Sequence, residues 1–167
     1  MLLDLSKIIG CPGGIVPFAV SLDLSGEVFG SCRPVQEPVL AEGRVRNTAG
    51  VLIMTGTVRT TLHGVCDRCA SEFLREVSYP IEAVLVQSLE NEDDADEWTF
   101  LLQDGSADLD EIVNTVFILS MDSKMLCRED CKGLCPTCGK NLNDGPCACR
   151  PEPDPRLAAL GKLLKNS

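Results

Sequence analysis

The sequence predicts an α+β fold in which an antiparallel β-sheet, or a barrel-like sheet, packs against one main helix. Three observations support this prediction. Several segments in the first half of the chain alternate apolar and polar residues, the segment 108–120 repeats apolar residues at the helical period, and six cysteines gather in a glycine- and proline-rich stretch at 127–149. A chain of 167 residues can bury one core with a small appendage.

Four segments are predicted to be strands because they either alternate apolar and polar residues or are rich in β-branched residues. They are residues 15–23, 39–46, 51–65 and 76–87. Residues 48–50 are expected to form a hairpin turn, and Gly56 is expected to bend the long third segment. The Cys-x-x-Cys motif at 66–69 then falls at a hairpin tip between the last two strands. Residues 98–102 are expected to form a further short strand.

The main helix is predicted over residues 108–120, with Asp108 as its N-cap. Its apolar stripe is Leu109, Ile112, Val113, Val116 and Phe117. Residues 127–150 hold too many Gly, Pro and Asn residues for regular structure and need cross-links to fold. Leucines at helical spacing behind an Asp-Pro pair predict a short amphipathic helix over 151–167. The chain thus divides into a β-rich core domain, 1–126, a cysteine-rich tail and a terminal helix.

Eight of the ten cysteines fall into four close pairs, a spacing typical of metal ligands. The N-terminus has no long apolar stretch, so we expect the reducing cytosol, where clustered cysteines bind metal more often than they form disulfides. Because tetrahedral zinc takes four thiolates, two structural zinc ions are predicted. The first would bind Cys66, Cys69, Cys127 and Cys131, and the second would bind Cys135, Cys138, Cys147 and Cys149. A single shared site that uses both Cys-x-x-Cys motifs is the leading alternative.

The residue types argue against catalysis at these sites. A catalytic zinc keeps an open position and usually has histidine or carboxylate ligands, and the chain has one histidine, His63. No glycine-rich phosphate loop, nucleophile elbow or HExxH motif occurs. We therefore expect a non-enzymatic protein. The alternative is a thiol-based redox sensor or oxidoreductase that uses the Cys-x-x-Cys motifs, although such motifs usually lie at a helix N-terminus.

The formal net charge of −10 argues against a protein that grips nucleic acid over its whole surface. Residues 1–123 carry a net charge of −13, and residues 124–167 carry +3. Contact with RNA or a partner would therefore be local. The candidate residues are Lys124, Arg128, Lys132, Lys140 and Arg150. The acidic run at 90–97 is expected to be a solvated loop, and no apolar window is long enough to span a membrane.

The chain resembles the YceD-like family of bacterial proteins, known for the accumulation of large-subunit ribosomal RNA. The resemblance rests on the motif CDRC at 66–69, the helix LDEIVNTVFILSM, the tail CREDCKGLCPTCGKNLNDGPCAC and the terminal DPRLAALGKLL. These features span most of residues 50–167, and the tail is similar to the form found in many Gram-positive and related bacteria. Some members keep ligand-type residues at 66, 69, 127 and 131 but lack the later motif, which favours pairing those four.

The resemblance implies a cytoplasmic, non-enzymatic factor for 23S ribosomal RNA accumulation or maturation, and hence for biogenesis of the large ribosomal subunit. The implied partner is ribosomal RNA or a large-subunit assembly intermediate. Either the basic tail would contact RNA directly, or the acidic sheet region would bind a basic ribosomal protein. Charge complementarity favours the second possibility. A third hypothesis is that the protein serves as a structural scaffold for a protein partner.

Overall fold

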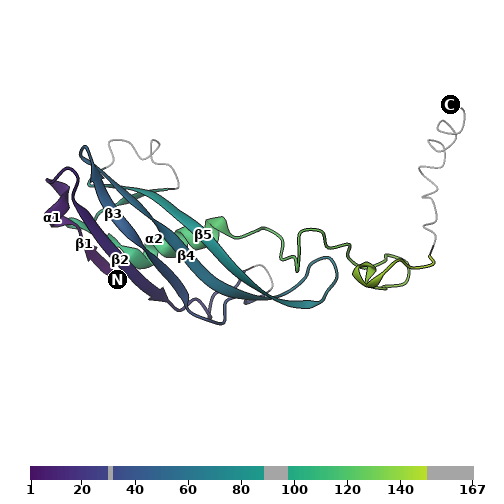
Figure 1. Cartoon of the computed structure of the whole chain (residues 1–167). Coiled ribbons are helices and arrows are strands. Elements are labelled where there is room, and N and C mark those ends of the chain that lie inside the picture. Colours follow the sequence, from purple (N-terminus) through teal and green to yellow (C-terminus); the bar gives the residue numbers. More distant parts are fainter. Residues whose placement is uncertain (30–31, 89–97, 150–167) are drawn as a thin grey trace, which may run out of the picture.

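The computed structural model describes residues 1–29, 32–88 and 98–149 and is built on a five-stranded sheet (Figure 1). The strands are β2 (Ile15–Leu22), β3 (Val39–Thr48), β4 (Val51–Val65), β5 (Glu72–Val86) and β6 (Thr99–Leu101). Strands β2 to β5 pair in chain order as antiparallel neighbours, and β6 joins β5 in parallel. The α+β prediction is confirmed. Among the described residues the sheet is open, with β2 and β6 as its edges.

Strands β4 and β5 form a hairpin of 15 residues on each side, longer than the other strands. Strand β4 begins and ends where the sequence predicts, whereas β5 begins four residues earlier than predicted, because Glu72 still pairs with Val65. The extra length carries the hairpin beyond the rest of the sheet towards the C-terminal tail (Figure 1). Its tip contains the first Cys-x-x-Cys motif, as expected.

Strand β4 runs through Gly56 without interruption, so the glycine does not divide the strand as the expected bend would. Gly56 faces Gly43 of β3. A Cβ atom on Gly56 would collide with the carbonyl oxygen of Glu42, and one on Gly43 would collide with that of Thr55. The glycine pair therefore marks a close approach of the two backbones.

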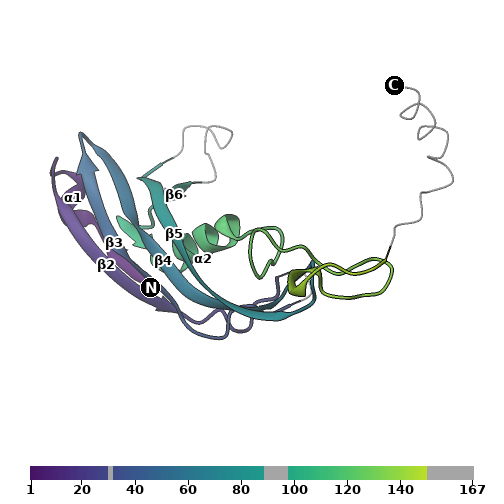
Figure 2. The ribbon, with the colours of Figure 1, turned by 45° about the vertical axis from the view of Figure 1, so that its right-hand side comes forward.

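Helix α2 (Leu109–Ser120) lies on the concave face of the sheet (Figure 2). The predicted N-cap is confirmed, since the Asp108 carboxylate accepts a hydrogen bond from the backbone N–H of Asp110 at 3.0 Å. All five residues of the predicted apolar stripe are buried. Phe117 lies edge-on to Phe29 and Tyr79, with ring centroids 6.0 Å apart in both pairs.

The other face of the sheet is exposed along β3, where buried and exposed residues alternate. This pattern is typical of an antiparallel sheet with one solvated face.

Three short elements outside the main sheet were not predicted. Strand β1 (Leu2–Asp4) pairs with β7 (Ser106–Asp108) as a second, two-stranded sheet, and helix α1 (Ser6–Ile9) follows β1. Each has only three or four residues, too few for a period to appear in the sequence. Residues 90–97, Arg150 and the predicted helix over 151–167 lie outside the described residues.

Among the described residues, Asn47 is the buried residue with a polar side chain, and 1% of its surface is exposed. Its amide nitrogen donates to the carbonyl oxygens of Ile8 at 2.6 Å and Ile9 at 2.9 Å. Its amide oxygen accepts from the backbone N–H of Gly50 at 2.8 Å. One side chain thus joins the end of α1 to the turn between β3 and β4.

We expect Asn47→Ala to lower the free energy of unfolding by about 1–3 kcal/mol, because buried backbone groups would lose their partners. Asn47→Asp keeps an acceptor for Gly50 but loses both donors, so it should destabilise as well. Urea unfolding at neutral pH measures both variants. If both unfold at the wild-type midpoint, this side chain does not stabilise the junction.

Candidate metal centres

The first group of four cysteines, called site 1, consists of Cys66, Cys69, Cys127 and Cys131. Their sulfur atoms all lie within 4.8 Å of one another. Two of the separations are 3.7 Å, between Cys66 and Cys131 and between Cys69 and Cys127. A tetrahedral ion with metal–sulfur bonds of about 2.3 Å places its ligands roughly 3.8 Å apart, whereas a disulfide needs about 2 Å. The geometry therefore suits a four-thiolate metal ion.

The hairpin tip between β4 and β5 supplies the first two sulfur atoms. The backbone N–H of Cys66 donates to the carbonyl oxygen of Ser71 at 2.9 Å, and that of Ala70 donates to the carbonyl oxygen of Cys66 at 2.8 Å. Ala70 has a φ of 54°, which closes the turn. Both Cys66 and Cys69 are buried, so the motif lies inside the contact between the hairpin tip and the tail and not on an open surface.

The two residues between Cys66 and Cys69 hold the tail against this tip. Asp67 and Met125 exchange two hydrogen bonds: the N–H of Met125 donates to the Asp67 carboxylate at 2.7 Å, and the N–H of Asp67 donates to the carbonyl oxygen of Met125 at 2.8 Å. The Arg68 guanidinium donates to the carbonyl oxygen of Cys131 at 3.0 Å. The N–H of Leu134 in turn donates to the carbonyl oxygen of Arg68 at 3.0 Å. Asp67 and Arg68 were not among the site residues predicted from the sequence.

The second group, called site 2, consists of Cys135, Cys138, Cys147 and Cys149, whose sulfur atoms also lie within 4.8 Å of one another. The N–H of Cys135 donates to the carbonyl oxygen of Lys140 at 2.8 Å, and the N–H of Gly139 donates to that of Cys135 at 2.9 Å. Gly139 has a φ of 70°, which favours glycine. The structure thus brings together the two expected sets of four. The motifs at 66–69 and 135–138 belong to different groups.

Within site 1 the environment lowers the pKa of some thiols and raises that of another. Burial opposes ionisation of Cys66, but backbone N–H groups of Cys127, Cys69 and Arg68 point at its sulfur and lower its pKa to about 6. For Cys127, burial and hydrogen bonds with the neighbouring thiols raise the pKa to about 12. The amide of Asn143 donates to the Cys131 sulfur at 3.3 Å and lowers the pKa of that thiol.

Site 2 has the same division. Backbone N–H groups of Cys138 and Thr137 lower the pKa of Cys135 to about 6. A hydrogen bond with Cys138, together with burial, raises the pKa of Cys149 to about 12. At neutral pH each group therefore holds an ionised thiol beside a protonated one, and a bound cation would displace the remaining protons.

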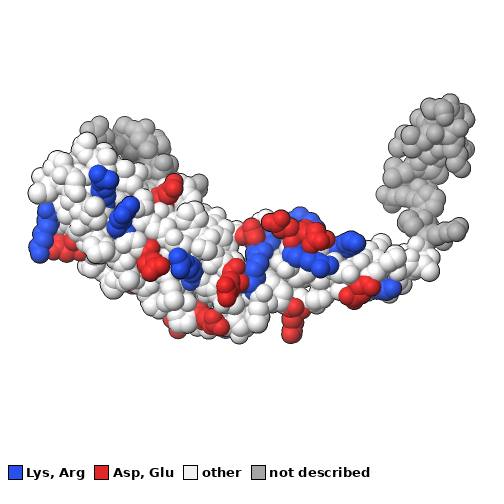
Figure 3. Space-filling model, viewed as in Figure 1, with Lys and Arg blue, Asp and Glu red and all other residues white. Residues whose placement is uncertain are grey.

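The basic residues of the tail are interspersed with acidic ones where the tail meets the β4–β5 hairpin (Figure 3). Arg128 pairs with Asp130 at 3.3 Å and donates to the side chain of Asn143 at 2.8 Å. The Lys140 ammonium donates to the carbonyl oxygen of Pro146 at 3.0 Å. Lys124 and Lys132 are exposed and make no ion pair with any residue that the structure describes.

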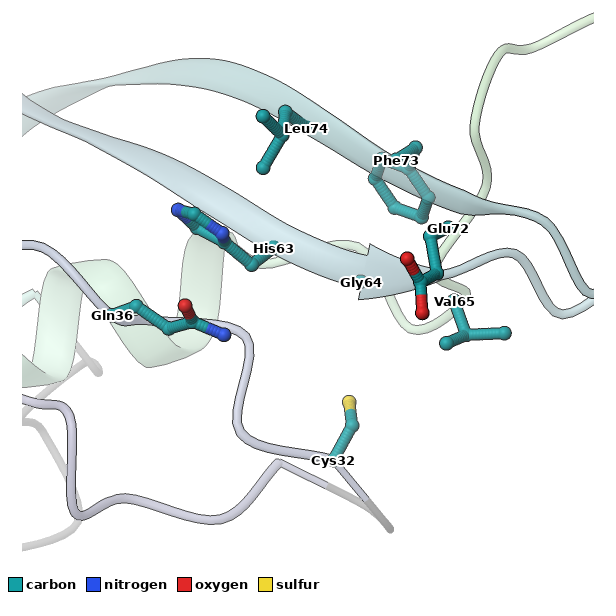
Figure 4. Close-up of a pocket in the computed structure, with 8 residues that line it drawn as sticks. All are labelled: Cys32, Gln36, His63, Gly64, Val65, Glu72, Phe73 and Leu74. Carbon is teal, nitrogen blue, oxygen red and sulfur yellow. The ribbon is translucent and has the colours of Figure 1, made fainter.

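An open groove of about 630 Å³ lies between the β4–β5 hairpin and the loop that contains Cys32 (Figure 4). His63 lies on its wall, and its Nε2 atom is 3.8 Å from a carboxylate oxygen of Glu37. Cys32 donates to the carbonyl oxygen of Phe29 at 3.3 Å. Within residues 1–29, 32–88 and 98–149, these ligand-type side chains form no third metal-ligating group. No helix in the same ranges is long and apolar enough to cross a membrane.

Comparison with protein families matches residues 54–164 to the model described as large ribosomal RNA subunit accumulation protein YceD. An uncharacterized protein of Mycobacterium tuberculosis (strain ATCC 25618 / H37Rv) is 29% identical over 123 residues, which cover 72% of this chain and 59% of the relative. The Zea mays protein named large ribosomal RNA subunit accumulation protein YCED homolog 1, chloroplastic, is 28% identical over 179 residues, with coverage of 88% and 61%.

The chain therefore spans about three fifths of the length of these relatives. No solved structure matches the chain.

Proposed function

The chain belongs to the YceD family of large ribosomal RNA subunit accumulation proteins, and from this premise we propose that it acts as a non-enzymatic accessory factor for 23S ribosomal RNA accumulation and large-subunit biogenesis. The observation that carries the proposal is the position of both four-cysteine groups inside the family match, which runs from residue 54 to residue 164. We propose that the protein works in the cytoplasm and that the two groups make the family region a metal-stabilised unit.

Zinc is the metal that we propose for both sites. Tetrahedral sets of four thiolates favour zinc or iron–sulfur centres, and sites made of two close cysteine pairs are typical of structural zinc. Four protein ligands leave no open position for a substrate or an activated water. The ions would therefore stabilise the fold: site 1 holds the tail on the hairpin tip, and site 2 closes the tail on itself.

The proposed partner is ribosomal RNA or a large-subunit assembly intermediate, reached directly or through a basic ribosomal protein. For direct contact, exposed Lys124 and Lys132 are the better candidates, because Arg128 and Lys140 already bond within the tail. For a basic protein, the net charge of −10 supplies long-range attraction. RNA crosslinking at Lys132 that Lys132→Glu weakens would support direct contact with RNA. An active protein without this crosslink would favour contact through a basic ribosomal protein.

Depletion of the protein from its host should lower mature 23S ribosomal RNA relative to 16S ribosomal RNA. The wild-type gene should restore the ratio, whereas a gene with Cys66→Ser and Cys69→Ser should not, because the tail would lose its attachment. Quantification of both RNAs after depletion measures the effect. An unchanged ratio would contradict the proposed function.

A thiol-based redox sensor or oxidoreductase is the second candidate, because the pKa values of Cys66 and Cys135 lie near 6. Reactive cysteines are usually partly exposed, however, while Cys66 is 2% and Cys135 6% exposed. Thiol titration of the native protein separates the candidates. Structural metal sites should hide eight thiols until a chelator is added, and redox thiols would react at once.

Zinc affinity should rise with pH and should fall most steeply below about pH 6. Zinc displaces protons from thiols, and the pKa values near 6 mean that Cys66 and Cys135 carry no proton at neutral pH. Below that range one more proton per site competes with the metal. Competition with a chelator from about pH 5 to about pH 8 measures the slope. A slope that is steeper above pH 6 than below it would contradict this assignment.

A further inference from the structure

The side chain of Asn143 joins the two metal sites. Asn143 lies on the 3-10 helix Leu142–Asp144, in the loop between Cys138 and Cys147 of site 2. Its amide nitrogen nevertheless donates to the sulfur of Cys131 in site 1 at 3.3 Å. Its amide oxygen accepts from the backbone N–H of Lys132 at 2.9 Å and from Arg128 at 2.8 Å. A residue held by one site therefore completes the surroundings of the other.

Further hydrogen bonds fix the position of Asn143. Both its backbone N–H and its side-chain amide donate to the side chain of Asn141, at 3.0 and 2.8 Å. The N–H of Leu142 donates to the carbonyl oxygen of Gly133 at 2.9 Å. Gly133 has a φ of 73°, and a Cβ atom there would lie 3.0 Å from the carbonyl oxygen of Arg68. The loop, the segment between the two sites and the hairpin tip are thus packed against one another.

We infer that Asn143 couples the two sites, so that zinc bound at one raises the affinity of the other for zinc. The inference rests on the proposed function, because it requires zinc at both sites. Zinc at site 2 fixes both ends of the loop that carries Asn143. The ordered loop presents an N–H donor to the Cys131 sulfur, and donors of this kind stabilise a ligating thiolate. Linkage makes the effect reciprocal, so zinc at site 1 must favour zinc at site 2 by the same factor.

A double-mutant cycle in the full chain tests the coupling. Site 2 is disabled by Cys147→Ser with Cys149→Ser, and zinc affinity at site 1 is measured by chelator competition, with the zinc count checked by native mass spectrometry. Disabling site 2 should weaken site 1 by about 10- to 100-fold in the presence of Asn143, the usual effect of losing an outer-shell donor. In an Asn143→Ala background the same change should have a much smaller effect.

Two further variants sharpen the result. Asn143→Asp keeps an acceptor for Lys132 and Arg128 but lacks the N–H donor, so it should lose the coupling as Asn143→Ala does. Asp144→Ala is the matched control, because Asp144 lies on the same short helix, is exposed and makes no side-chain hydrogen bond or ion pair with the described residues. It should keep the wild-type coupling.

The inference is overturned if disabling site 2 leaves site 1 unchanged, or if the same factor persists with Asn143→Ala or Asn143→Asp. Two zinc ions that bind independently overturn the coupling alone and leave the proposed structural role of zinc intact. A wild-type chain that binds no zinc overturns both.

Discussion

Replacing Cys66 and Cys69 together with serine is expected to remove one of two zinc ions and to release the tail from the sheet. Structural zinc contributes about 10–16 kcal/mol in small zinc-binding domains at neutral pH. Once it is lost, the tail beyond Met125 is held by the hydrogen bonds of Asp67 and Arg68, each with a net value of about 0.5–1.5 kcal/mol. Asp122 stays paired with Arg75, and Met125 stays buried in the main core. The main core should remain, because its buried residues form a cluster separate from Cys66, Cys69 and Cys131.

The measurement is zinc content together with hydrogen exchange. Residues 126–135 should lose protection in the double variant, while strands β3, β4 and the part of β5 within the sheet keep theirs. Cys11→Ser with Cys32→Ser is the matched control, since these cysteines belong to neither group. A tail that stays protected after the loss of zinc would show that site 1 does not attach it. Loss of protection throughout the sheet would show that the sheet depends on the same site.

Phe117→Ala is expected to have the largest effect on the sheet itself, lowering the free energy of unfolding by about 3–5 kcal/mol. Phe117 is fully buried between α2 and the sheet and lies edge-on to Phe29 and Tyr79. Removing the ring leaves a cavity and two aromatic side chains without their shared contact. Denaturant unfolding of the zinc-loaded protein measures the change.

The next residue of the helix provides the control. Ile118 is 43% exposed, so Ile118→Ala should cost less than about 1 kcal/mol. If Phe117→Ala costs no more than Ile118→Ala, the helix stripe does not form the core. A large cost for both would mean that the exposed side of α2 is covered in solution.

The main elements of the fold could be predicted because each is long enough to repeat its pattern. Strand β4 is rich in β-branched residues along its 15 residues, and α2 shows a full apolar stripe behind the Asp108 cap. Strands β1 and β7 have three residues each, and they pair across more than a hundred positions. Nothing local in the sequence marks such a pairing. The parallel addition of β6 to β5 likewise depends on the path of the chain between them.

The metal sites could likewise be predicted only in part. The four close pairs of cysteines could be predicted, because spacings of one to three residues can place two sulfur atoms on one ion. Which pairs share an ion was assigned with a single shared site as the alternative, and the structure brings together the two expected sets. The residues that support them could not be predicted. Asp67, Arg68 and Asn143 are common polar residues, and their contacts with Met125, Cys131 and Lys132 exist only after the tail has folded onto the hairpin. The one signal in the local sequence for these supporting residues was the polar pair Asp67 and Arg68 between Cys66 and Cys69.

Native mass spectrometry of the purified full chain can decide whether the two four-cysteine groups hold one zinc ion each. We expect the mass of the reduced chain with two zinc ions, and the release of eight reactive thiols when the ions are removed by acid or chelation. One zinc ion shared between the motifs, or a metal-free chain whose cysteines are joined by disulfides or react at once, would mean that two zinc ions do not hold the tail together.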